Sequence, residues 1–242
     1  MNGRTFDRRW LILGARVIAA IALNSQRFDA SMLIGVASHF ALIFPAIILH
    51  EVAHGYVAYL LGDPTAKNMG RLTLNPLKHI DPFGTIILPL VLLIGSGGAF
   101  FFGYAKPVPF NPRNFKDERT GMLLTGIAGP AMNVALAVVI GLATRLFPET
   151  GPAWLGTVAD GVVYFAFANL VLAFFNLVPI PPLDGSRVLQ WFLPDTLRDA
   201  YHQLERWGFF IIIGITWVFP QVFSAYISAT VIPVFSAITG LH

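Results

Sequence analysis

The chain contains 242 residues, of which 55% are hydrophobic and 12% are charged, and its mean hydropathy is +0.67. Because soluble domains carry about a quarter charged residues, this composition excludes an ordinary soluble globule and, equally, a disordered chain. The net charge of +3 comes from Lys and Arg between apolar runs, which argues against nucleic acid as a partner, and the absence of cysteine excludes disulfides and thiolate metal sites.

Long uncharged runs mark the predicted membrane spans, since about 20 apolar residues are needed to cross the hydrocarbon core. The first apolar segment, residues 10–23, is short and contains Arg16, so it could be either a span or an interfacial helix. The uncharged runs that follow are 30–50, 82–105, 120–144, 161–183 and 207–242. We therefore predict a single integral-membrane domain over residues 1–242, an all-α polytopic protein with about five to six transmembrane helices.

The loops between these runs differ in charge. Lys67, Arg71 and Lys78 lie in the loop before residue 82, and four further basic residues lie between residues 106 and 119, whereas the connection at 147–161 is only acidic. By the positive-inside rule both basic loops are cytoplasmic, so the run between them, residues 83–104, cannot cross the membrane an odd number of times. We predict a re-entrant segment there. Its many glycines and its Ile, Val and Phe residues favour a small membrane-associated β-hairpin or sheet.

The sequence HEVAH at residues 50–54 lies inside an apolar run. Residues four apart share one face of a helix, so His50 and His54 can bind one metal ion, and Glu51 suits a general base. Neutral imidazoles suit zinc. Ionisable side chains are costly inside a membrane unless they are paired or bound to metal, which favours a metal site over three polar groups that face a water-filled cavity.

A catalytic zinc site usually has three protein ligands, and Asp184 is the strongest remaining candidate. It directly follows the uncharged run 161–183, which ends with three prolines. These prolines break the helix and free backbone carbonyl groups, which membranes tolerate only where protein or a cavity satisfies them. The alternative is a helix end capped by Asp184 before Arg187. Since His54 and Asp184 lie near the C-terminal ends of their runs, the two runs must cross in the same direction if these side chains meet.

Four motifs in this order give the chain a resemblance to the site-2 protease family of intramembrane zinc metalloproteases: HEVAH, GRLTLNPLKHIDPFGT, AGPAMN and NLVPIPPLDG. The resemblance implies that His50, His54 and Asp184 hold Zn2+ and that Glu51 is the catalytic base, in a core at about residues 30–192. Without the PDZ or CBS domains of some members, the chain is expected to be a minimal member whose hairpin lies near the zinc.

Two asparagines belong to the resembling motifs. Asn133 is expected to be catalytic and substrate-binding, because it could hold the substrate carbonyl or stabilise a developing oxyanion. Asn176 is expected to contribute to substrate binding through the loop that carries Asp184. The alternative for both is a hydrogen bond between neighbouring helices, which is a frequent role of Asn in membrane spans.

The resemblance implies an enzyme, a zinc metalloendopeptidase that hydrolyses peptide bonds of membrane-anchored protein substrates. It is expected in the cell (plasma or inner) membrane, in contact with the lipid bilayer, with its active site toward the cytoplasm. A strand edge beside the zinc could bind an extended peptide by β-augmentation. The alternatives are a zinc-binding membrane transporter, which also places His and Asp in spans, and a non-catalytic scaffold. One compact cluster, with a glutamate that need not be a ligand, favours the protease.

Overall fold

The structure is a computed structural model that describes residues 30–96, 103–146 and 152–241. The described residues are mostly helical and contain no strand, which agrees with the predicted all-α class. They form two compact units, one with residues 30–40, 79–96 and 103–106 and the other with residues 41–78, 107–146 and 152–241. The segment at residues 10–23, predicted as a span or an interfacial helix, lies outside the described residues.

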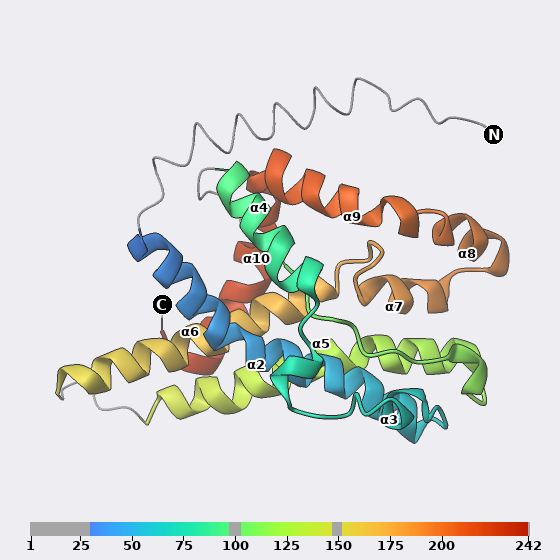
Figure 1. Ribbon diagram of the computed structural model, residues 1–242, viewed down its shortest axis with the longest axis horizontal. Coiled ribbons are helices and arrows are strands. Elements are labelled where there is room, and N and C mark those ends of the chain that lie inside the picture. Colours follow the sequence, from blue (N-terminus) through green and yellow to red (C-terminus); the bar gives the residue numbers. More distant parts are fainter. Residues whose placement is uncertain (1–29, 97–102, 147–151, 242) are drawn as a thin grey trace, which may run out of the picture. The chain divides into compact units, whose positions relative to one another are not determined.

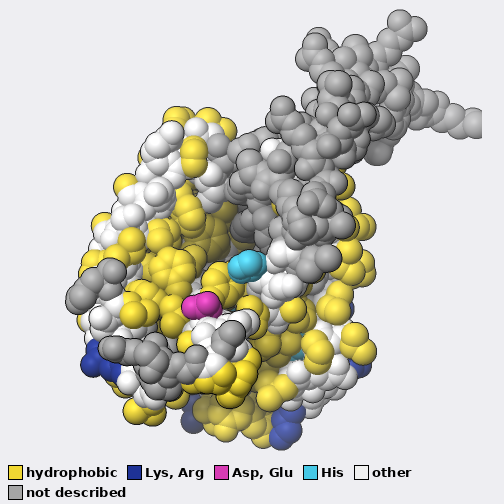
Figure 2. All heavy atoms as spheres, turned by 90° about the vertical axis from the view of Figure 1, so that its left-hand side faces the viewer, with side chains coloured by type: hydrophobic (Ala, Val, Ile, Leu, Met, Phe, Trp, Pro, Cys, Tyr) yellow, Lys and Arg dark blue, Asp and Glu magenta, His cyan; other side chains and the backbone are white. Residues whose placement is uncertain are grey.

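Four of the described helices are long and apolar enough to cross a membrane, over Ala37–Leu60, Glu118–Thr144, Trp154–Asn176 and Pro220–Thr239. They belong to helices α2 (Ala30–Leu60), α5 (Glu118–Thr144), α6 (Ala153–Asn176) and α10 (Pro220–Thr239) (Figure 1). Hydrophobic side chains make up much of the face drawn in Figure 2. Large apolar residues such as Val139, Trp154 and Val222 are at least 60% exposed, which is the pattern expected of helices that face lipid.

The larger unit is built around α5, which packs against α6 and against the short helix α7 (Gly185–Phe192), while α10 packs on α6. The buried positions of α5 are mainly small residues, including Gly129, Pro130 and Ala137. Small residues let helix backbones approach closely, which is the common mode of packing where no water drives association. Ala137 of α5, Leu170 of α6 and Val231 of α10 form the apolar centre of this packing.

Shorter helices complete the larger unit. They are α3 (Thr65–Asn68), η2 (Pro76–Lys78), η4 (Pro112–Asn114), α8 (Asp195–His202), α9 (Glu205–Ile213) and η5 (Gly214–Val218). Gly62 follows α2 with φ at +105°, a backbone conformation that L side chains rarely adopt. Asp63 comes next and is fully buried; its carboxylate accepts hydrogen bonds from Asn111 N–H at 2.7 Å and from the Asn114 side-chain amide at 2.6 Å. This carboxylate therefore joins the C-terminal end of α2 to the residues that precede α5.

In the smaller unit, the described part of the predicted β-hairpin is helical instead. Residues 82–95, expected to contain a strand, form the π-helical turn η3 (Pro82–Ile87) and helix α4 (Leu88–Gly95). Asp81 starts this helical stretch, because its carboxylate accepts hydrogen bonds from the N–H groups of Phe83 and Gly84 at 3.1 and 2.7 Å. A helix also satisfies its own backbone polar groups, which a lone strand pair in an apolar surrounding does not.

The two ends of this segment nevertheless lie side by side. Tyr104 N–H donates to the carbonyl of Gly84 at 3.0 Å, and Lys106 N–H donates to the carbonyl of His79 at 2.8 Å. The ring of Tyr104 occupies the space where a Cβ of residue 84 would be, so this close approach requires glycine. The chain thus returns after residue 102 to the place where the helical stretch began.

Candidate metal centre

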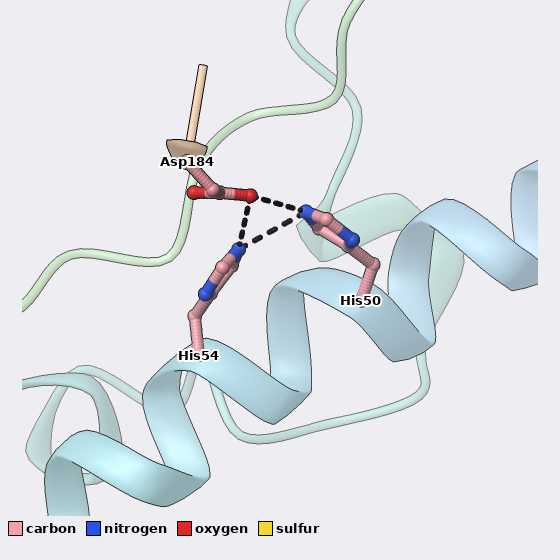
Figure 3. A group of neighbouring side chains, drawn as sticks. All are labelled: His50, His54 and Asp184. Carbon is pink, nitrogen blue, oxygen red and sulfur yellow. Dashed lines mark hydrogen bonds and ion pairs between the residues drawn. The ribbon is translucent and has the colours of Figure 1, made fainter. Parts of the chain in front are cut away.

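Helix α2 presents His50 and His54 one turn apart, with 6% and 5% of their surface exposed. Their Nε2 atoms are 3.0 Å apart. Asp184, which comes from the start of α7, places Oδ2 at 3.1 Å from each of these nitrogens (Figure 3). Within the described part of the chain, this is the group of His and acidic side chains that could hold a metal ion.

The outer nitrogens of the two imidazoles are both engaged by carbonyl oxygens. His50 Nδ1 lies 2.6 Å from Asn133 Oδ1, and His54 Nδ1 lies 2.6 Å from the backbone carbonyl of Thr125. Since a carbonyl oxygen only accepts, each Nδ1 must carry the proton and donate it. Each neutral ring then presents the lone pair of Nε2 to the centre of the group.

This proton assignment makes the group suited to a cation. When both rings are neutral, two Nε2 lone pairs and one carboxylate oxygen face one another at 3.0–3.1 Å, which is a donor set for a cation. Tetrahedral zinc with bonds of about 2.05 Å separates its ligand atoms by about 3.3 Å, close to these distances. Gly129 of α5 leaves the space open, because a Cβ there would lie 2.6 Å from His50 Nε2 and would also meet His54 Nε2. The donor set and the open space therefore fit zinc.

Neighbouring residues fix the position of the Asp184 carboxylate. Its second carboxylate oxygen, Oδ1, accepts a hydrogen bond from Arg187 Nη1 at 2.9 Å, and the Arg187 guanidinium lies 5.0 Å from the centre of the Phe110 ring. Gly185 brings the start of α7 against the carbonyl of Leu177, where a side chain would not fit. The side chain of Asp184 is buried, and the Arg187 guanidinium is the cationic partner of its carboxylate.

Glu51 follows His50 on α2 and is not one of the three converging side chains. Its Oε2 accepts a hydrogen bond at 2.8 Å from the backbone N–H of Val108. The side chain of Val108 fills the space beside Gly55, one turn further along α2. The segment before α5 thus holds one oxygen of this carboxylate beside the metal centre.

Several known proteins are similar to this chain in sequence. The model for peptidase family M50 matches residues 151–218. The chain is 41% identical to "Putative zinc metalloprotease YwhC" of Bacillus subtilis over 199 residues, which cover 78% of this chain and 87% of the relative. The chain belongs to peptidase family M50. This M50 peptidase is also 42% identical over 191 residues to "Putative zinc metalloprotease MJ0611" of Methanocaldococcus jannaschii, with 77% of the chain and 86% of the relative covered.

A third relative is "Putative zinc metalloprotease Rip2" of Mycolicibacterium smegmatis, 33% identical over 170 residues, which cover 69% of this chain and 62% of the relative. No solved structure matches the chain. The family and the names of these relatives confirm the expected resemblance, and with it a metallopeptidase that uses zinc.

The two predicted asparagines of this M50 peptidase both form hydrogen bonds within the protein. Asn133 is fully buried, and its amide nitrogen donates to Asn169 Oδ1 at 2.8 Å while its oxygen faces His50. The described contacts of its amide therefore link α6 to the metal-site residue His50. Asn176 ends α6 and donates to the carbonyl of Leu172 in its own helix at 2.9 Å.

Sequence reasoning missed Asn169 and Gly129. The signal for Asn169 was present, because it is an amide in the middle of an uncharged run, seven residues before Asn176. The signal for Gly129 was its place four residues before Asn133, which puts both on one face of α5.

Proposed function

We propose that this M50 peptidase hydrolyses peptide bonds of membrane-anchored proteins, close to the cytoplasmic face of the membrane. The observation that carries the proposal is the convergence of His50 Nε2, His54 Nε2 and Asp184 Oδ2 within 3.1 Å of one another, with an unliganded glutamate beside them. Three protein ligands and a neighbouring carboxylate are the composition of a catalytic rather than a closed structural zinc site.

In this proposal His50, His54 and Asp184 hold the zinc. Zinc held by three protein ligands supplies Lewis acidity, which polarises a peptide carbonyl and makes water a stronger acid. The protein itself keeps both imidazoles in the tautomer with a free Nε2 lone pair, through the acceptors at Nδ1. Burial of all three side chains limits the access of bulk water to the site.

Glu51 is the proposed general base. The N–H of Val108 binds one of its oxygens, so the other oxygen can take a proton from the attacking water and pass it to the leaving amine. General acid–base catalysis of this kind contributes about 10²–10⁴-fold to a rate. The role needs a carboxylate that is near the metal but is not a ligand, and the position of Glu51 next to His50 in α2, outside the converging group, supports it.

Position along α2 supports a site near one face of the membrane. At a rise of about 1.5 Å per residue, His54 lies about 9 Å and His50 about 15 Å from the end of the helix at Leu60. The loop that follows carries Lys67, Arg71 and Lys78, which favours the cytoplasm on that side. We further propose that residues 83–104 enter and leave the membrane on this same side, which the contacts of Gly84 with Tyr104 and of His79 with Lys106 support.

The test is co-expression with a panel of single-span membrane proteins, comparing the wild type with Glu51→Gln. We expect fragments with the wild type, at least about a 100-fold loss of cleavage with Glu51→Gln, and unchanged zinc content in the purified variant. Glu118→Gln, the same change at an exposed acid at the start of α5, is the matched control and should cleave normally. Cleavage by Glu51→Gln at the wild-type rate would refute the assignment, and zinc retained by Asp184→Ala at wild-type affinity would refute the ligand set.

A further inference from the structure

Asn169 is a second buried amide behind the metal centre. It lies in the middle of the apolar helix α6 and is 0% exposed, as is Asn133, its neighbour on α5. Burying an amide in an apolar surrounding is costly unless its groups are hydrogen bonded. Here they are: Asn169 Oδ1 accepts from Asn133 Nδ2 at 2.8 Å, and Asn169 Nδ2 donates to the carbonyl of Phe165 at 2.8 Å.

These hydrogen bonds have only one consistent direction. The Phe165 carbonyl can only accept, so Asn169 must turn its nitrogen to Phe165 and its oxygen to Asn133. Asn133 must then donate its own nitrogen to Asn169, which leaves its oxygen facing His50 Nδ1 at 2.6 Å. The ring can satisfy that oxygen only by donating from Nδ1. The Phe165 carbonyl of α6 thus acts through two side-chain amides, together with the more distant Ala46 carbonyl, to place a proton on Nδ1 of His50.

The acceptors that bind the Nδ1 protons of the two histidines differ in how firmly they are oriented. His54 donates to a backbone carbonyl, that of Thr125, whose direction is set by the helix. His50 donates to a side-chain amide, which can exchange its oxygen and nitrogen by turning about one bond. Turned over, Asn133 would present N–H groups to His50 Nδ1, and the ring would have to donate from Nε2, the nitrogen needed by the metal. On this side the direction of the amide depends on the acceptors of Asn133 Nδ2, which are Asn169 Oδ1 at 2.8 Å and the backbone carbonyl of Ala46 at the longer distance of 3.4 Å.

We propose that Asn169 is a positioning residue for zinc, which acts through Asn133 to keep the Nε2 lone pair of His50 directed at the metal. The inference rests on the ligand set of the proposed function. Partners of this kind behind metal-bound histidines change metal affinity by about 10–100-fold when they are lost. Asn169 touches neither metal nor substrate in this scheme.

The chain supplies a matched control. Asn176 lies two turns further along α6 and donates to the carbonyl four residues before it, that of Leu172, just as Asn169 donates to Phe165. The described hydrogen bonds of Asn176 include none to Asn133. Replacing Asn176 by leucine therefore removes the same amide and the same local bond but leaves the pair behind His50 intact.

The experiment measures zinc affinity of the purified full chain by competition with a chelator, for the wild type, Asn169→Leu, Asn169→Asp, Asn176→Leu and His50→Ala. We expect Asn169→Leu to bind zinc about tenfold or more weakly and Asn176→Leu to bind as the wild type does. Asn169→Asp should restore affinity, because the apolar middle of α6 favours the neutral form of a carboxyl group, which can accept from Asn133 while its O–H donates to Phe165. Unfolding curves of the metal-free proteins show which variants are folded; if Asn169→Leu is not, Asn169→Ala replaces it.

A double substitution separates positioning from packing. If Asn169 acts through Asn133, adding Asn169→Leu to Asn133→Leu should weaken zinc binding no further. Equal zinc affinity of Asn169→Leu and Asn176→Leu would overturn the proposal, as would equal losses in Asn169→Leu and Asn169→Asp. Wild-type affinity in His50→Ala would instead overturn the ligand set itself, so the two failures are distinguishable.

Discussion

Gly129→Ala should act in opposite directions on helix stability and on metal binding. In a helix interior, alanine is more stable than glycine by about 0.5–1 kcal/mol, because glycine loses more backbone freedom on folding. At Gly129 the added Cβ would lie 2.6 Å from His50 Nε2 and would also collide with His54 Nε2. Comfortable separations of such atoms begin at about 3.5 Å, so the atoms must move apart by about 0.9 Å.

Moving the His50 and His54 rings away from residue 129 costs free energy. Both rings are tied at Nδ1 by hydrogen bonds of 2.6 Å, one to Asn133 and one to Thr125, and breaking a buried hydrogen bond of this kind costs about 1–3 kcal/mol. A displacement of about 1 Å at a catalytic site costs about 100-fold in function. We therefore expect zinc affinity to fall by about 100-fold, which corresponds to about 2.8 kcal/mol, and cleavage of a reporter substrate to fall with it.

The assay compares three purified proteins: the wild type, Gly129→Ala and Gly161→Ala. Gly161 is also a helical glycine, but a Cβ there would meet no atom within 4 Å, so this variant should bind zinc normally. Chelator competition gives the zinc affinity, and unfolding of the metal-free proteins shows whether Gly129→Ala remains folded. Wild-type zinc affinity in a folded Gly129→Ala protein would show that the metal does not occupy the space between Gly129 and the imidazoles.

Two further predictions concern Asp63, which follows α2, and Asp184, which lies at the start of α7. Asp63→Asn should lower the free energy of unfolding at pH 7 by about 1–3 kcal/mol, because Asp63 accepts hydrogen bonds from Asn111 and Asn114. Burial raises the pKa of Asp63, but its hydrogen bonds lower it by more. The stabilisation is therefore present above the ordinary carboxyl pKa and lost as the pH falls through the lowered one, so unfolding curves of wild type and variant should converge in acid; a gap that widens would contradict this. Arg187→Gln should weaken zinc binding by about tenfold in chelator competition, because it removes the partner of Asp184 Oδ1, and an unchanged affinity would exclude that role.

The sequence is most informative at the few ionisable side chains in or next to apolar runs. His, Glu and Asp are so costly inside apolar runs that their positions alone indicate His50, Glu51, His54 and Asp184. The expectation that distant parts of the chain meet also follows from few observations, since both sets of residues stand near the ends of their runs. In the folded protein, the side chains of His50, His54 and Asp184 meet within 3.1 Å.

The predicted strands at residues 83–104 show that amino-acid composition alone does not distinguish a short strand from a short helix. Ile, Val and Leu between glycines and prolines are compatible with either a strand or a helix, and a short apolar run does not distinguish them by period. The capping by Asp81 of the N–H groups of Phe83 and Gly84 favours the helix. An Asp directly before a proline is a helix-start signal that could have been weighed against the glycines.

The role of Asn133 depends on information that a sequence lacks. Whether an amide in a span points at substrate or at a neighbouring helix is decided by the rotation of each helix about its axis. A modest rotation of α5 or α6 would separate Asn133 from Asn169. The pairing of these residues is therefore visible only in the packed helices, although each amide is already conspicuous in its apolar run.

Three electron-rich atoms lie together between α2, α5 and α7, where a divalent cation would join the ends of these helices to one another. Binding at such a junction contributes to folding as well as to chemistry. Protein stripped of zinc should therefore unfold more easily than zinc-bound protein.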